Sequence, residues 1–256
     1  MTKKLFYAAC IVAMALTGCK KDPQPEPTPE PEPQTVSRIA SYVVKTNPNG
    51  MPMTMTRNYT WENGVLVQTV DSIITSFMGP VVTAERYIYE NGLLVKKEET
   101  SGKWQHHLTY EDGLLKTFVD INIEHNDTLY SGEILSYTAN DEVEDVIVDL
   151  GEKKNKYHFT WENGDAVQVV KYVIYPEEEA DTAVANYTFD NKHCPFIGIP
   201  LGAELSSDVS FIIERQSKHN FIDSEYTYTY DDQDRLVSKV KENDTTTYQY
   251  IEQTIR

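Results

Sequence analysis

Histidine and cysteine are the side chains here most able to bind metals or act as nucleophiles, and two pairs of them are adjacent. His106 and His107 form one pair, and His193 and Cys194 form the other. Adjacent side chains of a β-strand point to opposite faces, so His106 and His107 are not expected to chelate one metal ion. A Cys-His nucleophile needs contact in space, which adjacency does not establish, and we expect Cys194 beside Pro195 to be inert. We therefore predict no catalytic residue, no metal site and no cofactor.

Acidic clusters at 120–124 and 231–234 offer oxygen ligands for calcium. They lack the glycine and distal glutamate of an EF-hand loop, and turn chemistry already accounts for aspartate at such positions. Pairs of carboxylates also serve as the catalytic groups of glycosidases. One alternative function is therefore a carbohydrate-active or peptide-cleaving enzyme that uses carboxylates in the concavity of a sheet.

Aromatic residues recur at a spacing of two, which places both rings of a pair on one face of a strand. They could pack in the core and form cross-strand pairs, or they could form a concave aromatic face that stacks a sugar or a peptide. The candidate ligand-stacking aromatics are Tyr59, Trp61, Tyr87, Tyr89, Tyr110, Trp161, Tyr228 and Tyr230.

These aromatics belong to a repeated unit that reads as strand, tight turn and strand. In its clearest copy, residues 87–90 lead into Asn91-Gly92 and then into an apolar strand. Both central residues of a type I′ turn need positive φ, which Asn tolerates and Gly adopts freely. The same turn chemistry recurs at Asn63-Gly64, Asp112-Gly113 and Asn163-Gly164. Degenerate copies of the unit cover 137–143, 187–192 and 226–237.

The repeat predicts an all-β domain over residues 36–256, an antiparallel meander of hairpins. We expect a curled single-layer sheet or a porin-like barrel, soluble rather than membrane-spanning, because polar residues alternate along its strands. Residues 191–207 hold Pro and Gly among apolar residues, so they predict an irregular packed segment or short helix that plugs or caps the sheet. The other predicted strands are 65–75, 81–89, 114–124, 144–150, 167–175, 211–215 and 236–240.

The first 35 residues predict an export and lipidation signal followed by a tether. Lys3-Lys4, an apolar run and Leu16-Thr17-Gly18-Cys19 match a bacterial lipoprotein signal, so 1–18 would be removed and Cys19 lipidated. Residues 19–35 then form a Pro/Glu-rich tether in extended polyproline II conformation. We expect an exported monomer anchored through this lipid to the outer membrane, at its periplasmic face or the cell surface. The formal charge of −17 argues against a nucleic-acid partner.

The layout resembles two kinds of bacterial protein. Tyr228-Thr229-Tyr230-Asp231 with Arg235-Leu236 is similar to the tyrosine-aspartate repeats of large secreted proteins. The lipoprotein signal, the tether, the repeated hairpins and the late segment 191–196 together resemble a family of Bacteroidetes prolipoproteins of unknown function. That resemblance implies a porin-like fold, and it carries no catalytic or ligand residues that could be transferred to this chain.

These observations favour a non-enzymatic, lipid-anchored envelope protein whose β domain is a binding or structural module. The expected partners are the membrane, through the N-terminal lipid, and a glycan or an envelope protein.

Overall fold

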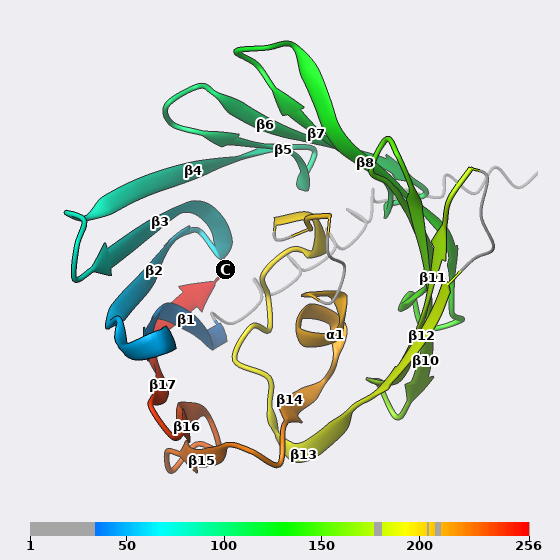
Figure 1. Ribbon diagram of the computed structural model, residues 1–256. Helices are drawn as coiled ribbons and strands as arrows, with labels where there is room; N and C mark the ends of the chain where they lie inside the picture. Colours follow the sequence, from blue (N-terminus) through cyan, green and yellow to red (C-terminus); the bar gives the residue numbers. More distant parts are fainter. Residues whose placement is uncertain (1–33, 177–180, 204, 208–210, 256) are drawn as a thin grey trace, which may run out of the picture. The chain divides into compact units, whose positions relative to one another are not determined.

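A computed structural model describes residues 34–176, 181–203, 205–207 and 211–255, and most of these residues lie in β-strands (Figure 1). Cys19 and the tether up to residue 33 lie outside the described residues. The strands are β1 (Gln34–Thr46), β2 (Met53–Glu62), β3 (Val65–Thr75), β4 (Val81–Glu90), β5 (Leu93–Glu99), β6 (Trp104–Glu111), β7 (Leu114–Asn122), β8 (Asp127–Tyr137), β9 (Val143–Asp149), β10 (Lys154–Glu162), β11 (Asp165–Ile174), β12 (Asp181–Asn186), β13 (Thr188–His193), β14 (His219–Ile222), β15 (Thr227–Tyr230), β16 (Leu236–Lys241) and β17 (Asp244–Ile255). The helical elements are η1 (Pro48–Gly50), η2 (Leu201–Ala203) and α1 (Phe211–Gln216).

Fifteen of the strands form one antiparallel sheet, in the order β12 to β1 followed by β17, β16 and β15. The predicted all-β meander is confirmed, and it curls as a single layer around an inner face (Figure 1). The sheet is open, because its edge strands β12 and β15 do not pair with each other in the described part of the chain. Between these edges lies the separate β13–β14 pair, which is joined to the turn of the β15–β16 hairpin by a bridge from His193 to Arg235.

The tight turns have the backbone that their sequences demand. Asn91 has φ 50° and Gly92 has φ 82°, and the Asn63-Gly64 turn has φ values of 48° and 85°. Positive φ at both central residues defines the predicted type I′ turn, and the twist of that turn matches the twist of the paired strands. The Asp112-Gly113 and Asn163-Gly164 turns also have positive φ at both residues.

Each of these hairpins carries a β-bulge just after its turn. In the β4–β5 hairpin, Tyr89 pairs with Leu94 while Ile88 pairs with Lys96, so Val95 is an extra residue. A bulge of this kind advances the side-chain alternation of its strand by one residue. The residues in the equivalent position of the other hairpins are Val67, Lys116, Val167 and Val237.

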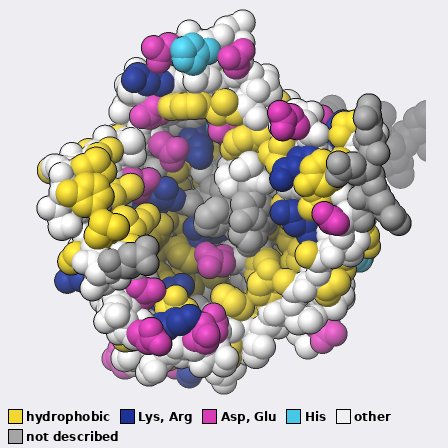
Figure 2. Space-filling model, in the orientation of Figure 1, with side chains coloured by type: hydrophobic (Ala, Val, Ile, Leu, Met, Phe, Trp, Pro, Cys, Tyr) yellow, Lys and Arg dark blue, Asp and Glu magenta, His cyan; other side chains and the backbone are white. Residues whose placement is uncertain are grey.

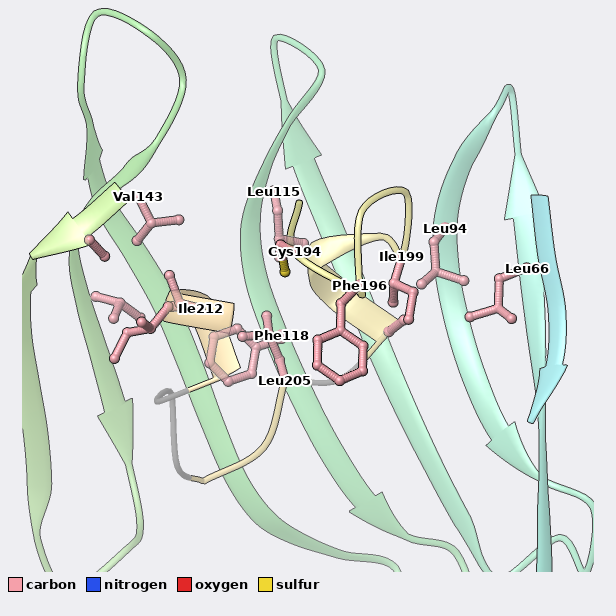
Figure 3. Close-up of a cluster of buried hydrophobic side chains, with 14 of the residues drawn as sticks. Leu66, Leu94, Leu115, Phe118, Val143, Cys194, Phe196, Ile199, Leu205 and Ile212 are labelled. Carbon is pink, nitrogen blue, oxygen red and sulfur yellow. The ribbon is translucent and has the colours of Figure 1, made fainter. Parts of the chain in front are cut away.

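A plug formed by residues 194–203, 205–207 and 211–217 covers part of the inner face. Figure 3 shows its apolar side chains, including Phe196, Ile199 and Ile212, beside leucines of alternate strands of the sheet. These leucines are Leu66 of β3, Leu94 of β5 and Leu115 of β7. Phe196 also lies under the Arg215 guanidinium, 3.6 Å from its ring centroid. The plug therefore confirms the predicted irregular packed segment from residue 194 onward, whereas residues 191–193 of the predicted segment belong to strand β13.

The plug also holds the clearest error of the sequence analysis. The predicted strand at 211–215 is the helix α1, in which Ile212 and Ile213 are both buried. A six-residue helix with adjacent buried residues shows neither a period of 3.6 nor one of 2, so periodicity could not identify it. No helix in the described segments is long and apolar enough to span a membrane.

Packing of the plug against the sheet predicts unequal effects for two glycine substitutions. A Cβ at Gly202 in η2 would lie 2.7 Å from a Leu108 methyl of β6, whereas a Cβ at Gly79 meets nothing within 4 Å. We expect Gly202→Ala to lower the free energy of unfolding by about 1–3 kcal/mol through overpacking. Gly79→Ala should change it by less than about 0.5 kcal/mol. Urea unfolding measures both, and equal effects would show that η2 does not pack tightly against β6.

Candidate functional site

The aromatic stripe is first of all a scaffold. The second aromatic of most repeats donates a hydrogen bond to a backbone carbonyl of the preceding repeat, as Tyr89 does to Leu66 at 2.9 Å and Tyr110 to Leu94 at 2.8 Å. These bonds link consecutive hairpins side by side and keep the aromatic polar atoms satisfied. Trp61 and Trp161 make the same bond to Ile39 and Val143. Two tyrosines at other positions make similar bonds, Tyr137 to Leu115 and Tyr250 to Leu236.

The eight predicted stacking aromatics are not gathered in one place. Tyr59, Trp61 and Tyr87 are buried in the core, and Trp161 is partly buried against it. Three of the other four aromatics line one of two pockets. Tyr89 and Tyr110 line a pocket of about 250 Å³ beside the plug. Tyr228 lines a pocket of about 470 Å³ near β14, while the Tyr230 hydroxyl contacts Asp190 and Asn220.

Cys194 lies in the plug as a protonated, poorly nucleophilic thiol. Its Sγ donates to the carbonyl oxygen of Glu214 at 2.8 Å. Burial raises the pKa of Cys194 to about 12. A thiol with such a pKa contains almost no thiolate at neutral pH, so it is a weak nucleophile.

The acidic cluster at 231–234 is used for turn and ion-pair contacts. Asp231 accepts hydrogen bonds from the backbone N–H groups of Gln233 and Arg235 and from Nε of Arg235 at 2.7 Å. Asp234 pairs with Lys192 at 2.6 Å. Across the described ranges, no group of three or more His, Cys, Asp or Glu residues is arranged to hold a metal ion.

A polar pocket of about 330 Å³ lies on the inner face, across β4 to β8. It is placed toward the strand ends that are opposite the Asn-Gly turns, since Trp104 begins β6 and Glu99 ends β5. Figure 2 looks into one end of the curled sheet and shows that the interior is hollowed, with charged side chains among hydrophobic ones. The lining residues are Thr83, Glu85, Lys97, Glu99, Trp104, Gln105, His106, Asp120 and Leu129.

Cross-strand pairing assembles this pocket from residues far apart in sequence. Lys97 pairs with His106, and His106 pairs in turn with Asp120, so the three form one row across β5, β6 and β7. In the adjacent row, Glu85 of β4 pairs with Glu99 of β5. Side chains of directly paired residues lie on the same face about 5 Å apart, which explains why these polar groups converge.

His106 is the most buried of the lining side chains, at 2% exposure. Its ring stacks against Phe118 at a centroid distance of 5.9 Å and lies near Tyr130 at 6.3 Å. Neither ring nitrogen has a hydrogen-bond partner among the described atoms. Burial, assisted by the Lys97 ammonium and His107, lowers the pKa of His106 to about 3. The imidazole is therefore neutral at physiological pH.

Charged groups surround this neutral ring. The Lys97 ammonium lies 3.4 Å from a carboxylate oxygen of Glu85, which also accepts a hydrogen bond from Thr69. Oε2 of Glu99 is buried without a partner in the described part of the molecule. Three carboxylates and one ammonium make the pocket acidic overall, and it contains more hydrogen-bond acceptors than donors.

Sequence reasoning separated His106 from His107 correctly but did not find the pocket. His107 points away from the pocket and its Nε2 lies 3.1 Å from Oε1 of Gln105. Reading β5 with an unbroken period of two would place Lys96 and Glu98 beside Leu94 on the inner face. The bulge at Val95 places Lys97 and Glu99 there instead.

In two of the other pockets, the main polar side chains already have partners. In the pocket beside the plug, the tyrosine hydroxyls are bonded to backbone carbonyls. In a pocket of about 180 Å³ near Cys194, the Arg235 guanidinium is bonded to Asp231, Ser37 and Glu252. The pocket around His106 is distinguished from these two by its unpaired buried polar atoms.

The described residues therefore form an open antiparallel meander with an internal plug and an acidic pocket on its inner face. No protein-family model matches the chain, and no curated protein matches it.

Proposed function

We propose that the protein is a non-enzymatic, lipid-anchored envelope protein whose β domain binds a ligand in the pocket around His106. One observation carries the binding role: a buried imidazole and a buried carboxylate oxygen of Glu99 lack partners at the edge of a 330 Å³ pocket. An unsatisfied buried polar group costs about 1–3 kcal/mol, which a bound ligand would recover. Pockets for small ligands typically have volumes of about 300–1,000 Å³.

The anchoring part of the proposal rests on Leu16-Thr17-Gly18-Cys19. A lipid on Cys19 would hold the domain at a membrane through the tether, and tethering keeps a binding domain at a high local concentration near envelope ligands.

Replacement of Cys19 tests the anchor. Cells grown with a palmitate analogue should label the wild-type chain, and Cys19→Ala should abolish the labelling because the acceptor thiol is gone. The mutant protein should also leave the membrane fraction. Cys10→Ala is the matched control, since Cys10 lies within the predicted signal and should not affect labelling. Equal labelling of the Cys19→Ala and wild-type proteins would contradict the anchor.

A glycan array, together with pull-down from outer-membrane extracts, tests binding in general. We expect the lipidated protein to retain at least one ligand, and Trp104→Ala to weaken that retention. Blank results in both experiments with correctly lipidated protein would contradict a binding role.

A second candidate is a carbohydrate-active or peptide-cleaving enzyme. It is favoured by the convergence of Glu85, Glu99 and Asp120 in one pocket, because hydrolases of sugars use paired carboxylates. Incubation with envelope glycans and peptides distinguishes the candidates. Turnover that is lost in Glu99→Gln would establish the enzyme, whereas retention of uncleaved ligand supports the binding protein.

A further inference from the structure

The chemistry of the pocket restricts the ligand class, because a ligand that pairs with neutral His106 must both donate and accept. One nitrogen of a neutral imidazole carries a proton and the other carries a lone pair. Both nitrogens of His106 lack partners in the described residues. The two nitrogens point in different directions, so each needs its own partner, and a ligand with only donors or only acceptors would leave one nitrogen unsatisfied. A hydroxyl group does both.

The other lining groups also favour a ligand that both donates and accepts hydrogen bonds. Glu85, Glu99 and Asp120 accept hydrogen bonds, and Lys97 donates them. Trp104 is 38% exposed on the same pocket, which leaves ring surface available for stacking. An aromatic ring beside several polar groups suits a ligand that has one apolar face and a polar edge.

Other ligand classes fit less well. The excess of carboxylates repels anions, and the described residues contain no group of three ligands for a metal. A protonated amine would satisfy the carboxylates, but it cannot accept the imidazole N–H.

From these contacts we propose that the pocket binds a neutral polyhydroxylated ligand, a sugar unit whose ring stacks on Trp104 and whose hydroxyls bond to Glu99 and His106. This proposal rests on the proposed binding function. The Lys97 side chain, paired with Glu85 at 3.4 Å, is the flexible neighbour that moves aside to admit a hydroxyl to the ring.

Nuclear magnetic resonance of the histidine rings tests the proposal. Lipidated full-length protein, labelled with ¹⁵N in its histidines and held in a sugar-free detergent, is titrated with glucose, galactose, mannose and N-acetylglucosamine. Parallel titrations use ethanolamine and spermidine as amine probes. We expect at least one sugar to shift the His106 signals saturably while the ring stays neutral.

Two variants assign the signal change to the pocket. Trp104→Ala should weaken sugar binding about tenfold through lost stacking. Tyr172→Ala, which removes an exposed aromatic on β11, should leave the affinity unchanged.

The outcomes separate this inference from the proposed function. Shifts caused by an amine but by none of the sugars would overturn the sugar proposal and preserve a binding pocket. Sugar binding on the array with unmoved His106 signals would overturn the assignment to this pocket. Loss of binding in Tyr172→Ala to the same extent as in Trp104→Ala would also overturn it. If neither the array nor any titration detects a ligand, both the sugar proposal and the proposed binding function are overturned.

Discussion

Phe118→Ala is expected to lower the free energy of unfolding by about 3–5 kcal/mol, the range typical of a large aromatic removed from a core. Phe118 is completely buried and stacks against His106. The substitution removes ring contacts and leaves a cavity that the curled sheet cannot readily close. Urea unfolding monitored by circular dichroism measures the loss. A change below 1 kcal/mol would contradict the packing described for β7 and β8.

Gly132 lies opposite Phe118 in the β7–β8 pair, and the ring tip occupies the space where a side chain would be. A Cβ on Gly132 would lie 2.0 Å from Cζ of Phe118. Gly132→Ala alone should therefore cost about 1–3 kcal/mol by overpacking. Combining it with Phe118→Leu, which lacks the clashing atoms, should cost less than the sum of the single substitutions. Strict additivity would show that the ring does not cover the glycine.

Acid should destabilise the fold through His106. Its pKa is lowered from an ordinary 6.5 to about 3 in the folded state, so the unfolded chain binds a proton that the folded chain excludes. Above pH 6.5 this difference in proton binding costs the folded state no stability. As the pH falls from 6.5 toward 3, the free energy of unfolding declines. The slope contributed by this one group is about 1.4 kcal/mol per pH unit over that window.

His106→Met removes this titration while retaining an apolar, flexible side chain of similar reach. Urea unfolding at pH 4, 5, 6 and 7 should show a shallower acid slope for His106→Met than for the wild type. Lys97, Asp120, Glu85 and Tyr130 face the same ring and remain in both proteins, so the difference between slopes isolates His106. An unchanged slope in His106→Met would contradict a buried neutral imidazole.

The repeat made the architecture of the sheet predictable, because its determinants are local. Asn or Asp followed by Gly specifies the turn, and alternating aromatics specify the strand before it. Six of the seven other predicted strands agree with the structure to within two residues at each end. The strands β1, β8, β12, β14 and β17 were not among the predicted strands. In β17 the threonine-rich first half lacks large alternating side chains, although Tyr248 and Tyr250 complete the pattern.

The pocket could not be predicted because its assembly depends on features that sequence alternation does not encode. The bulge at Val95 determines that Lys97 and Glu99 face inward. The register between β5, β6 and β7 then determines that Lys97, His106 and Asp120 align in a row. The predicted aromatics were recognisable one at a time, but their hydrogen bonds to carbonyls of the preceding hairpin appear only once the strands are paired.

The lipoprotein signal is independent of these structural arguments, since Cys19 lies outside the described residues. It remains a prediction from Leu16 to Cys19, and the labelling of Cys19→Ala tests it separately. The pocket around His106 does not depend on the proposed anchor, since its lining residues all lie in the described sheet.

A crystal structure of the mature protein with the tightest-binding sugar from the array is the most direct test of the binding pocket. The ligand should lie on the inner face, stacked on Trp104 and within hydrogen-bond distance of Glu99 and His106. A sugar bound instead at Tyr89 and Tyr110, or on the outer face of the sheet, would contradict the assignment of the site.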